Sequence, residues 1–209
     1  TLSRGYEALV LTNGMKPMQK LEKKLLSIKK NFNKKLMIRV SLDHYSKSLH
    51  ESERGNNTWE VTIRGLKWLS DNDFNFFIAS RKISNESENE LRNSFKKFIS
   101  ENQLDIDPYD QKKLIFFPEM DKNKDATEIS ENCWDILNVD KSSLMCSSSR
   151  IIVKHKNDDF PSVQPCTLLS HVKDFNLGKS LKESRNDVYL NHKFCSQFCV
   201  LGGSKCNIE

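Results

Sequence analysis

The stretch KLMIRVSLD, residues 35–43, decides the fold of the first half of the chain. One face of the stretch carries only apolar side chains, which are Leu36, Ile38, Val40 and Leu42. Met37 adds an apolar residue to the opposite face. A nearly continuous apolar strand is typical of a parallel sheet that is buried on both faces. The stretch therefore predicts a buried parallel strand and an α/β fold class.

Three further apolar runs have the same character, and they lie at residues 7–14, 74–80 and 113–118. Helical patterns separate the four runs, so that strands and helices alternate along the chain. Because crossovers between parallel strands are right-handed, this alternation predicts one parallel sheet. Four such units do not close a barrel by themselves. They predict either an open α/β domain or part of a (β/α) barrel.

Helices are expected between these runs. The first extends from about Pro17 to Phe32, since proline is tolerated in the first turn of a helix. The second begins after Thr58, a residue type that can cap a helix. The third begins at a capping box formed by Ser87 and Glu90.

The composition excludes several classes of protein. The net charge is +5, and the lysines between Lys20 and Lys35 alternate with apolar residues at helical spacing. They indicate a solvated helix face, and nucleic-acid binding is not expected because no row of aromatic residues is interleaved with them. No apolar run reaches the roughly 18–20 residues of a membrane helix, so no membrane partner is expected. No secretion signal opens the chain, which predicts a cytoplasmic location.

The character of the chain changes after Pro118. A polar linker at 121–130 separates residues 1–120, the α/β part, from residues 121–209. Apolar segments at 150–156 and 162–169, joined by a turn-rich loop, predict a β-hairpin in this second part. All six cysteines of the chain lie there, and this segregation predicts a site built by one small α+β module.

The cysteines are Cys133, Cys146, Cys166, Cys195, Cys199 and Cys206. In a reducing compartment, clustered thiols are expected to bind metal rather than to form disulfides. Soft thiolates favour zinc or an iron–sulfur cluster, and four of them complete either site. The gaps in the last group differ from the C-x2-C pairs of zinc ribbons, which favours iron–sulfur. Cys133, beside Trp134, is equally well explained as a core residue.

Several segments resemble one enzyme family when their order is considered. TNG at 12–14, IRVSLDHYSKSLHESERG at 38–55 and TIRGLKWLSDNDFNFFIASRK at 62–82 resemble the second half of the radical S-adenosylmethionine (radical SAM) core. The cysteine-rich tail resembles the auxiliary-cluster extensions of that family, called twitch or SPASM domains. The resemblance implies the C-terminal portion of a partial (β/α)6 TIM-like barrel, with a small Cys-rich α+β extension.

The defining C-x3-C-x2-C motif of that family is absent from the sequence. The resemblance therefore implies a fragment that lacks the first two βα units and is inactive alone. In the intact enzyme, a [4Fe–4S] cluster outside this chain would reductively cleave S-adenosylmethionine. The resulting radical would modify an unknown small-molecule or peptide substrate, and an electron donor would be required.

The resemblance also implies which residues bind cofactors. Ser41 and Asp43 would contact S-adenosylmethionine or its surroundings, and Ser80 and Arg81 would meet its polar or carboxylate end. Each of these four also has an ordinary explanation as a local hydrogen-bonding or surface residue. An auxiliary [4Fe–4S] cluster would be held by Cys146, Cys166, Cys195 and Cys199, with Cys206 as an alternative closing ligand. The competing hypothesis is a zinc-binding, non-catalytic interaction module attached to an α/β domain.

Overall fold

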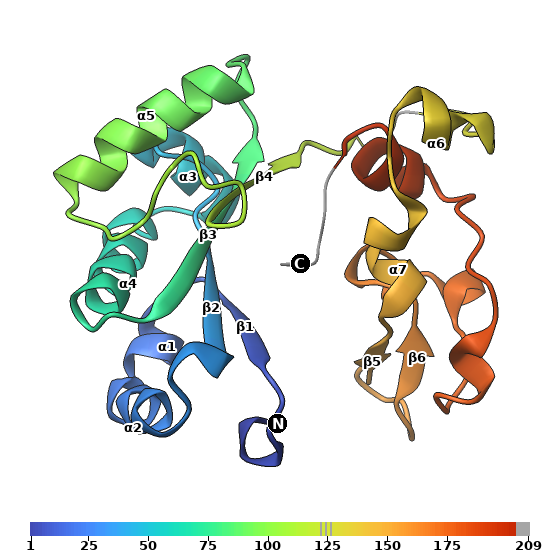
Figure 1. Cartoon of the computed structure of the whole chain (residues 1–209), viewed down its shortest axis with the longest axis horizontal. Coiled ribbons are helices and arrows are strands. Elements are labelled where there is room, and N and C mark those ends of the chain that lie inside the picture. Colours follow the sequence, from blue (N-terminus) through green and yellow to red (C-terminus); the bar gives the residue numbers. More distant parts are fainter. Residues whose placement is uncertain (122, 124, 126, 204–209) are drawn as a thin grey trace. The chain divides into compact units, whose positions relative to one another are not determined.

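The computed structural model describes residues 1–121, 123, 125 and 127–203. It divides the chain into two compact units, Thr1–Glu119 and Met120–Glu209 (Figure 1). The division expected from the sequence, between residues 120 and 121, lies one residue further along the chain.

The first unit is built on a parallel sheet of four strands. The strands are β1 (Ala8–Thr12), β2 (Leu36–Ser41), β3 (Asn75–Lys82) and β4 (Leu114–Pro118). They follow one another in the order β1-β2-β3-β4, and all three pairings are parallel. In the register, Ile38 of β2 stands between Val10 and Phe76. The predicted α/β class and parallel sheet are confirmed.

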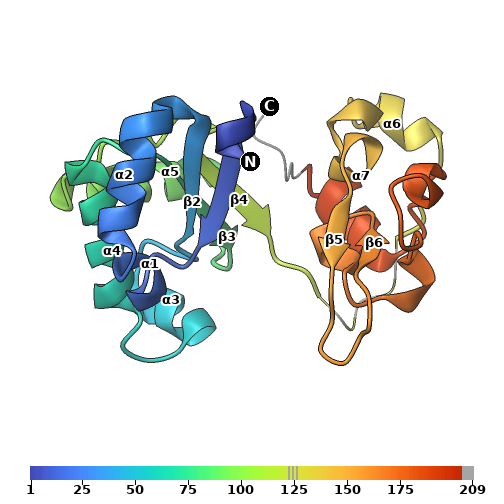
Figure 2. The same ribbon diagram turned by 90° about the horizontal axis from the view of Figure 1, so that it is seen from below.

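The helices of this unit are α1 (Lys16–Gln19), α2 (Glu22–Phe32), α3 (Lys47–Arg54), α4 (Trp59–Asp71) and α5 (Glu88–Glu101). Of these, α1, α2, α4 and α5 lie on one face of the sheet (Figures 1 and 2). Each successive strand is therefore added on the same side of the one before it, and the connecting helices lie on the same face. Doubly wound sheets differ, because their strand order reverses and helices cover both faces.

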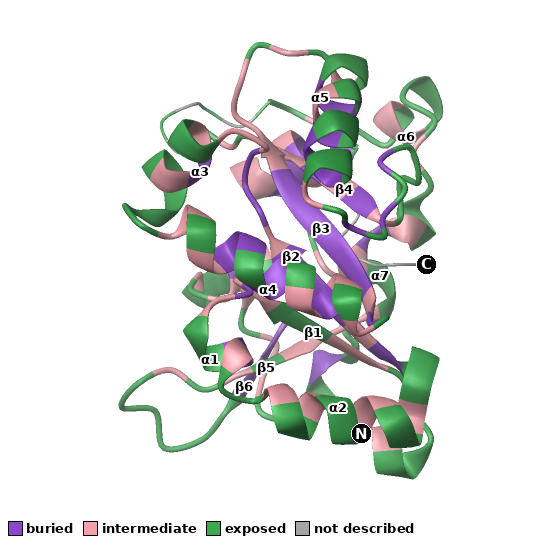
Figure 3. Ribbon diagram, turned by 90° about the vertical axis from the view of Figure 1, so that its left-hand side faces the viewer, coloured by how far each residue is buried: buried purple, intermediate pink, exposed green. Residues whose placement is uncertain are grey.

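The core of the first unit fills the space between the sheet and these helices (Figure 3). The strands contribute Ile38, Val40, Phe76, Ile78 and Leu114, and the helices contribute Leu66, Leu69, Leu91, Phe95 and Phe98. The opposite face of the sheet carries apolar side chains such as Met37 and Phe77 together with Arg39, whose guanidinium lies 5.9 Å from the centre of the Phe117 ring.

The two outer strands of the sheet each pair with one neighbour within the described residues. The outer edge of β1 therefore carries backbone groups without a strand partner. Val10 and Leu11 of this strand are 43% and 57% exposed, on opposite faces. Two large apolar side chains thus face solvent at the edge of the sheet.

The helix expected from Pro17 to Phe32 is instead two helices, because α1 ends at Gln19 and α2 begins at Glu22. Thr58 is the N-cap residue of α4, as expected, but it makes no side-chain capping bond: its hydroxyl donates to the Gly55 carbonyl at 2.6 Å and accepts no hydrogen bond from the helix. The capping box of Ser87 and Glu90 is confirmed, with both reciprocal hydrogen bonds present.

The turn after β1 packs closely against α4. Gly14 has a φ of +71°, and a Cβ added at Gly65 in α4 would lie 2.0 Å from the Gly14 carbonyl oxygen. Gln19 ties the same turn to α4, because its amide donates to the carbonyls of Gly14 and Val61 at 3.0 and 2.9 Å. The close approach of backbone to backbone explains why Gly65 has no side chain.

The second unit contains α6 (Asn132–Ile136), α7 (Met145–Ser148), β5 (Ile151–Val153), β6 (Ser162–Gln164) and a π-helix (Cys195–Val200). The strands form the predicted hairpin, since β5 and β6 pair antiparallel. Short 3-10 helices lie at Leu2–Arg4 and Asn33–Lys35 in the first unit, and at Lys141–Ser143, Thr167–Leu169, Lys173–Phe175 and Glu183–Arg185 in the second. In the described part of the chain, no helix is both long and apolar enough to cross a bilayer.

Candidate functional site

The β-hairpin of the second unit brings two cysteines to the same end. Cys146 lies in α7, just before β5, and Cys166 follows β6 directly. The register pairs Ile151 with Gln164, so the residues before β5 and after β6 are neighbours. Antiparallel pairing thus places near one another two thiols that are far apart in the sequence.

The π-helix supplies two more cysteines. Cys195 is buried and Cys199 is half-buried. The wide turn is marked by the hydrogen bond from the Leu201 N–H to the Ser196 carbonyl at 2.8 Å, which spans five residues. A π-turn of this kind is rare, and such turns occur frequently at functional sites.

These four cysteines line one small apolar cavity. Cys146, Cys166, Cys195 and Cys199 border it together with Leu168, Leu169, Val188, Leu190 and Phe194. Its volume of about 20 Å³ is sufficient for one water molecule or one ion. Three separate segments of the chain therefore contribute thiols to a single enclosed space.

Burial raises the pKa of two of the cavity thiols, Cys195 and Cys146. Burial raises the pKa of the Cys195 thiol to about 11, and the nearby Cys166 and Cys146 sulfurs add to the rise. Burial also raises the pKa of Cys146, as does the charge of Cys166, while the Arg150 guanidinium opposes the rise. The thiols are thus close enough to influence one another electrostatically. Metal binding there would have to displace protons.

Arg150 braces the segment that carries Cys146. Its guanidinium donates to the carbonyl oxygens of Cys146 at 2.7 Å and Ser149 at 2.9 Å. It also donates to Ser184 at 2.9 Å and Asn186 at 3.3 Å, across the unit. All four acceptors are neutral carbonyls, and Arg150 has no carboxylate partner among the described residues. A half-buried positive charge therefore stands beside the cysteines without a protein anion.

The thiols border the cavity but do not yet converge on one point. Among the described residues, no three Cys, His, Asp or Glu side chains are placed to hold a metal ion as they stand. Cys133 is outside the cavity: its sulfur accepts from the Ser130 N–H at 3.4 Å, and it is half-buried rather than a core residue. Cys206 lies outside the described residues.

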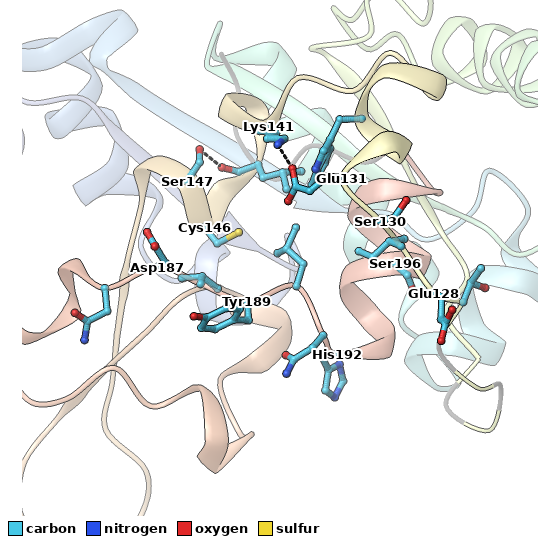
Figure 4. Close-up of a pocket in the computed structure, with 18 of the residues that line it drawn as sticks. Glu128, Ser130, Glu131, Lys141, Cys146, Ser147, Asp187, Tyr189, His192 and Ser196 are labelled. Atoms are coloured by element: carbon cyan, nitrogen blue, oxygen red, sulfur yellow. Dashed lines mark hydrogen bonds and ion pairs between the residues drawn. The ribbon is translucent and has the colours of Figure 1, made fainter.

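A second and much larger cleft adjoins this cavity in the same unit. It encloses about 1100 Å³, and Cys146 borders both spaces. Figure 4 shows Cys146, Tyr189 and His192 among its lining residues. Its walls carry both charges, including the ion pair between Lys141 and Glu131. Sequence reasoning gave no sign of this cleft, because its walls come from three separate stretches, 127–134, 141–150 and 185–196, that are irregular or form only short helices.

In the first unit, the predicted polar residues meet at the carboxyl ends of β2 and β3. Asp43 is buried and its carboxylate accepts from both the Nε and a terminal nitrogen of Arg54. Ser80 is also buried and donates to the Asp43 carbonyl at 2.9 Å. Arg81 forms an ion pair with Glu53. Ser41 ends β2 and is half-buried.

Two buried histidines lie at the same end of the sheet, and sequence reasoning did not single them out. The Nδ1 of His50 accepts from the Asp43 N–H at 3.3 Å, while its Nε2 has no hydrogen-bond partner. The Nε2 of His44 lies 3.5 Å from Glu86. Burial lowers the pKa of both histidines. Histidines near strand ends were visible in the sequence, but their burial was not.

Comparison of the chain with protein-family models, with curated proteins and with solved structures finds no match. The residues described above therefore carry the functional argument.

Proposed function

We propose that the second unit binds a metal–thiolate centre through Cys146, Cys166, Cys195 and Cys199. The observation that carries this proposal is their position around one enclosed apolar cavity. Four thiolates are a complete ligand set for zinc or for a [4Fe–4S] cluster. The donor chemistry fits either centre, and binding requires the four sulfurs to turn toward a common point. The cavity of about 20 Å³ has room for one zinc ion as it stands, whereas a [4Fe–4S] cluster would also require the cavity walls to move apart.

We propose further that this centre is the auxiliary iron–sulfur cluster of a radical SAM enzyme, of which the chain is the later part. The first unit supports this proposal through its sequential strand order and its helices on one face. Both features are expected of a segment of a (β/α) barrel. The outer edge of β1, which pairs with no described strand, is also consistent with this proposal, because in a complete barrel a further strand would pair there.

The strand ends of the first unit would serve S-adenosylmethionine in this enzyme. Active sites of barrels lie at the carboxyl ends of the strands, where Ser41, Asp43, Ser80 and Arg81 are found. Asp43 and Ser80 are held by internal bonds, so they would shape the site rather than contact the ligand. Ser41 and Arg81 would be the residues that contact S-adenosylmethionine. Arg81 would give up its ion pair with Glu53 and bind the carboxylate of the ligand instead.

The chemistry that an iron–sulfur cluster supplies when bound is electron transfer or ligation of substrate at iron. The chain itself would hold the cluster, exclude water through the apolar lining of the cavity, and support Cys146 through Arg150. Electron donor, second [4Fe–4S] cluster and substrate would come from outside this chain.

Zinc is the second candidate, because four thiolates form the tetrahedral set of structural zinc sites. In that case the second unit is a non-catalytic interaction module. The two candidates differ in what the purified protein would contain, so one experiment separates them.

The test is anaerobic reconstitution of the full chain with ferrous iron and sulfide, followed by metal analysis. We expect about four iron and four sulfide ions per chain, with visible thiolate-to-iron absorption. Replacing Cys146 or Cys195 by serine should abolish binding, whereas Cys133→Ser should leave it unchanged. A colourless protein with one zinc ion would support the second candidate, and a chain that retains neither metal would overturn the proposal.

A further inference from the structure

The large cleft of the second unit is bounded along one side by residues 187–191, which belong to no helix or strand. Exposure alternates along this segment, with Asp187, Tyr189 and Asn191 exposed and Val188 and Leu190 half-buried. Val188 and Leu190 line the cysteine cavity. The segment thus has the two-faced pattern of a strand, with its apolar row directed toward the cysteines.

The backbone of this segment has no partner. No hydrogen bond joins the N–H or C=O groups of residues 187–191 to any other described residue. The strand β6 of the same unit differs, because Val163 pairs with β5 on one side and exchanges bonds with Leu177 and Gly178 on the other. Residues 187–191 therefore border the cleft with alternating exposure, as an edge strand does, and with backbone groups that bond to no described residue.

We propose that this edge binds an extended polypeptide segment, which adds to residues 187–191 as a strand within the cleft. Strand addition satisfies the unused backbone groups through main-chain hydrogen bonds. Five residues extend over about 17 Å, which is enough for several paired positions. The cleft volume of about 1100 Å³ is at the upper end of small-molecule pockets and suits a peptide.

The side chains around the cleft also favour a chain-like ligand over a compact one. Arg185, Asp187 and Glu128 have no hydrogen-bonded or charged partner in the described part of the protein, and all three are exposed. Glu128 and Asp187 lie on different sides of the cleft rather than at one point (Figure 4). Tyr189, which is 77% exposed, and Trp134 offer aromatic surface for a side chain of the peptide.

A peptide in this cleft would lie beside the proposed metal centre, because Cys146 borders both spaces. This link rests on the proposed function and would make a polypeptide the substrate class. The strand addition itself needs no metal, so it can be tested on the metal-free chain.

The probe is an array of random peptides of about twelve residues, applied to the full chain with and without metal. Peptides that bind are then examined by amide hydrogen exchange. Backbone amides at 187–191 should exchange rapidly in the free protein and become protected in the complex. Methylation of alternate peptide nitrogens should abolish binding in one register and leave it intact in the other, because only alternate N–H groups face the pairing strand.

Variants of the full chain test the site. Tyr189→Ala should weaken peptide binding about ten-fold, as expected for an aromatic contact residue. Phe160→Ala removes another exposed aromatic residue of the same unit that does not line the cleft, and it should change nothing. Absence of any binding peptide, or protection confined to residues outside 187–191, would overturn the inference. Peptide binding by a chain that retains no metal would uphold the inference while the proposed function fails.

Discussion

At the scale of single residues, His50 is a histidine that the fold keeps neutral. It is fully buried, and its ring lies edge-on to Trp59 at 5.6 Å. Burial lowers its pKa most, the Asp43 charge raises it, the Arg54 charge lowers it and the Glu51 charge raises it. The folded protein therefore binds a proton at His50 less readily than the unfolded chain does.

This difference predicts how stability depends on pH. Above the unfolded pKa of about 6.5 neither state carries the proton, so His50 does not affect the pH dependence. As the pH falls below that value, the unfolded chain takes up the proton first, and the free energy of unfolding should decrease. Urea unfolding between pH 7.5 and 5 gives the slope of the unfolding free energy against pH. This slope measures the protons taken up on unfolding, and His50→Gln should lower that number by up to about one. Ser52→Ala, an exposed change in the same helix, should keep the wild-type slope.

Arg150 is the residue on which the cysteine site depends beyond its ligands. Replacement by glutamine removes both the charge and the bonds to four carbonyls, so metal affinity should fall about 10- to 100-fold. Lysine keeps the charge and should recover part of that loss. Competition titration with a chromophoric zinc chelator measures the affinity.

Arg185→Gln provides the control for that experiment. Arg185 lines the same large cleft but makes no hydrogen bond to the Cys146 segment, so its loss should leave the affinity unchanged. Thermal unfolding of the metal-free variants separates general damage from an effect on the site. Equal affinities of wild type and Arg150→Gln would show that Arg150 only supports the fold.

At the scale of elements, the contact between α4 and the turn after β1 reverses a familiar rule. An alanine in place of a mid-helix glycine ordinarily stabilises a helix by about 1 kcal/mol. At Gly65 the new Cβ would meet the Gly14 carbonyl at 2.0 Å, and backbone must shift. Gly65→Ala should therefore lower the free energy of unfolding by about 1–3 kcal/mol.

The control is Lys67→Ala, an exposed change in the same helix. Its effect should lie within about 0.5 kcal/mol of zero. Chemical denaturation of both variants measures the difference. If Gly65→Ala instead raised the free energy of unfolding, the backbone of the turn after β1 would have to move away from the new Cβ at little cost.

The elements themselves were predictable where one local signal decides them. The four strands follow from apolar runs, and α5 follows from its capping box. The break between α1 and α2 was not predictable from the apolar spacing. Nor was the missing side-chain cap at Thr58, because this residue has helical φ and ψ angles instead of the extended backbone that lets a side chain cap a helix. The pairing of Asp43 with Arg54 also depends on how the loop after β2 folds back, and no sequence pattern gives that.

The candidate site was predictable only in its ligand types. Six cysteines in one module indicated a metal site, but spacing did not show that Cys133 lies apart from the others. The cavity exists because a hairpin register and a π-turn bring three segments together. The role proposed for residues 187–191 was not predictable either, because the amino-acid sequence does not show which backbone groups lack a hydrogen-bond partner.

At the scale of the whole molecule, the division into two units predicts an uneven response to metal. All four proposed ligands belong to Met120–Glu209, and none to Thr1–Glu119. Metal at 100 times its dissociation constant should stabilise the second unit by about 2.7 kcal/mol. Hydrogen exchange of the full chain should show slower exchange there and no change in the sheet of the first unit. Equal slowing in both units would mean that the chain unfolds as one body.

The outer edge of β1 has a consequence for the behaviour of the chain in solution. The backbone groups on this edge pair with no strand in the part of the chain that the structure describes. Together with the exposed Val10 and Leu11 they form a template onto which a β1 strand of another molecule can be added. Self-association should therefore rise with protein concentration and begin at this edge. A lysine at either position would act as a gatekeeper that keeps the chain dispersed without touching the core.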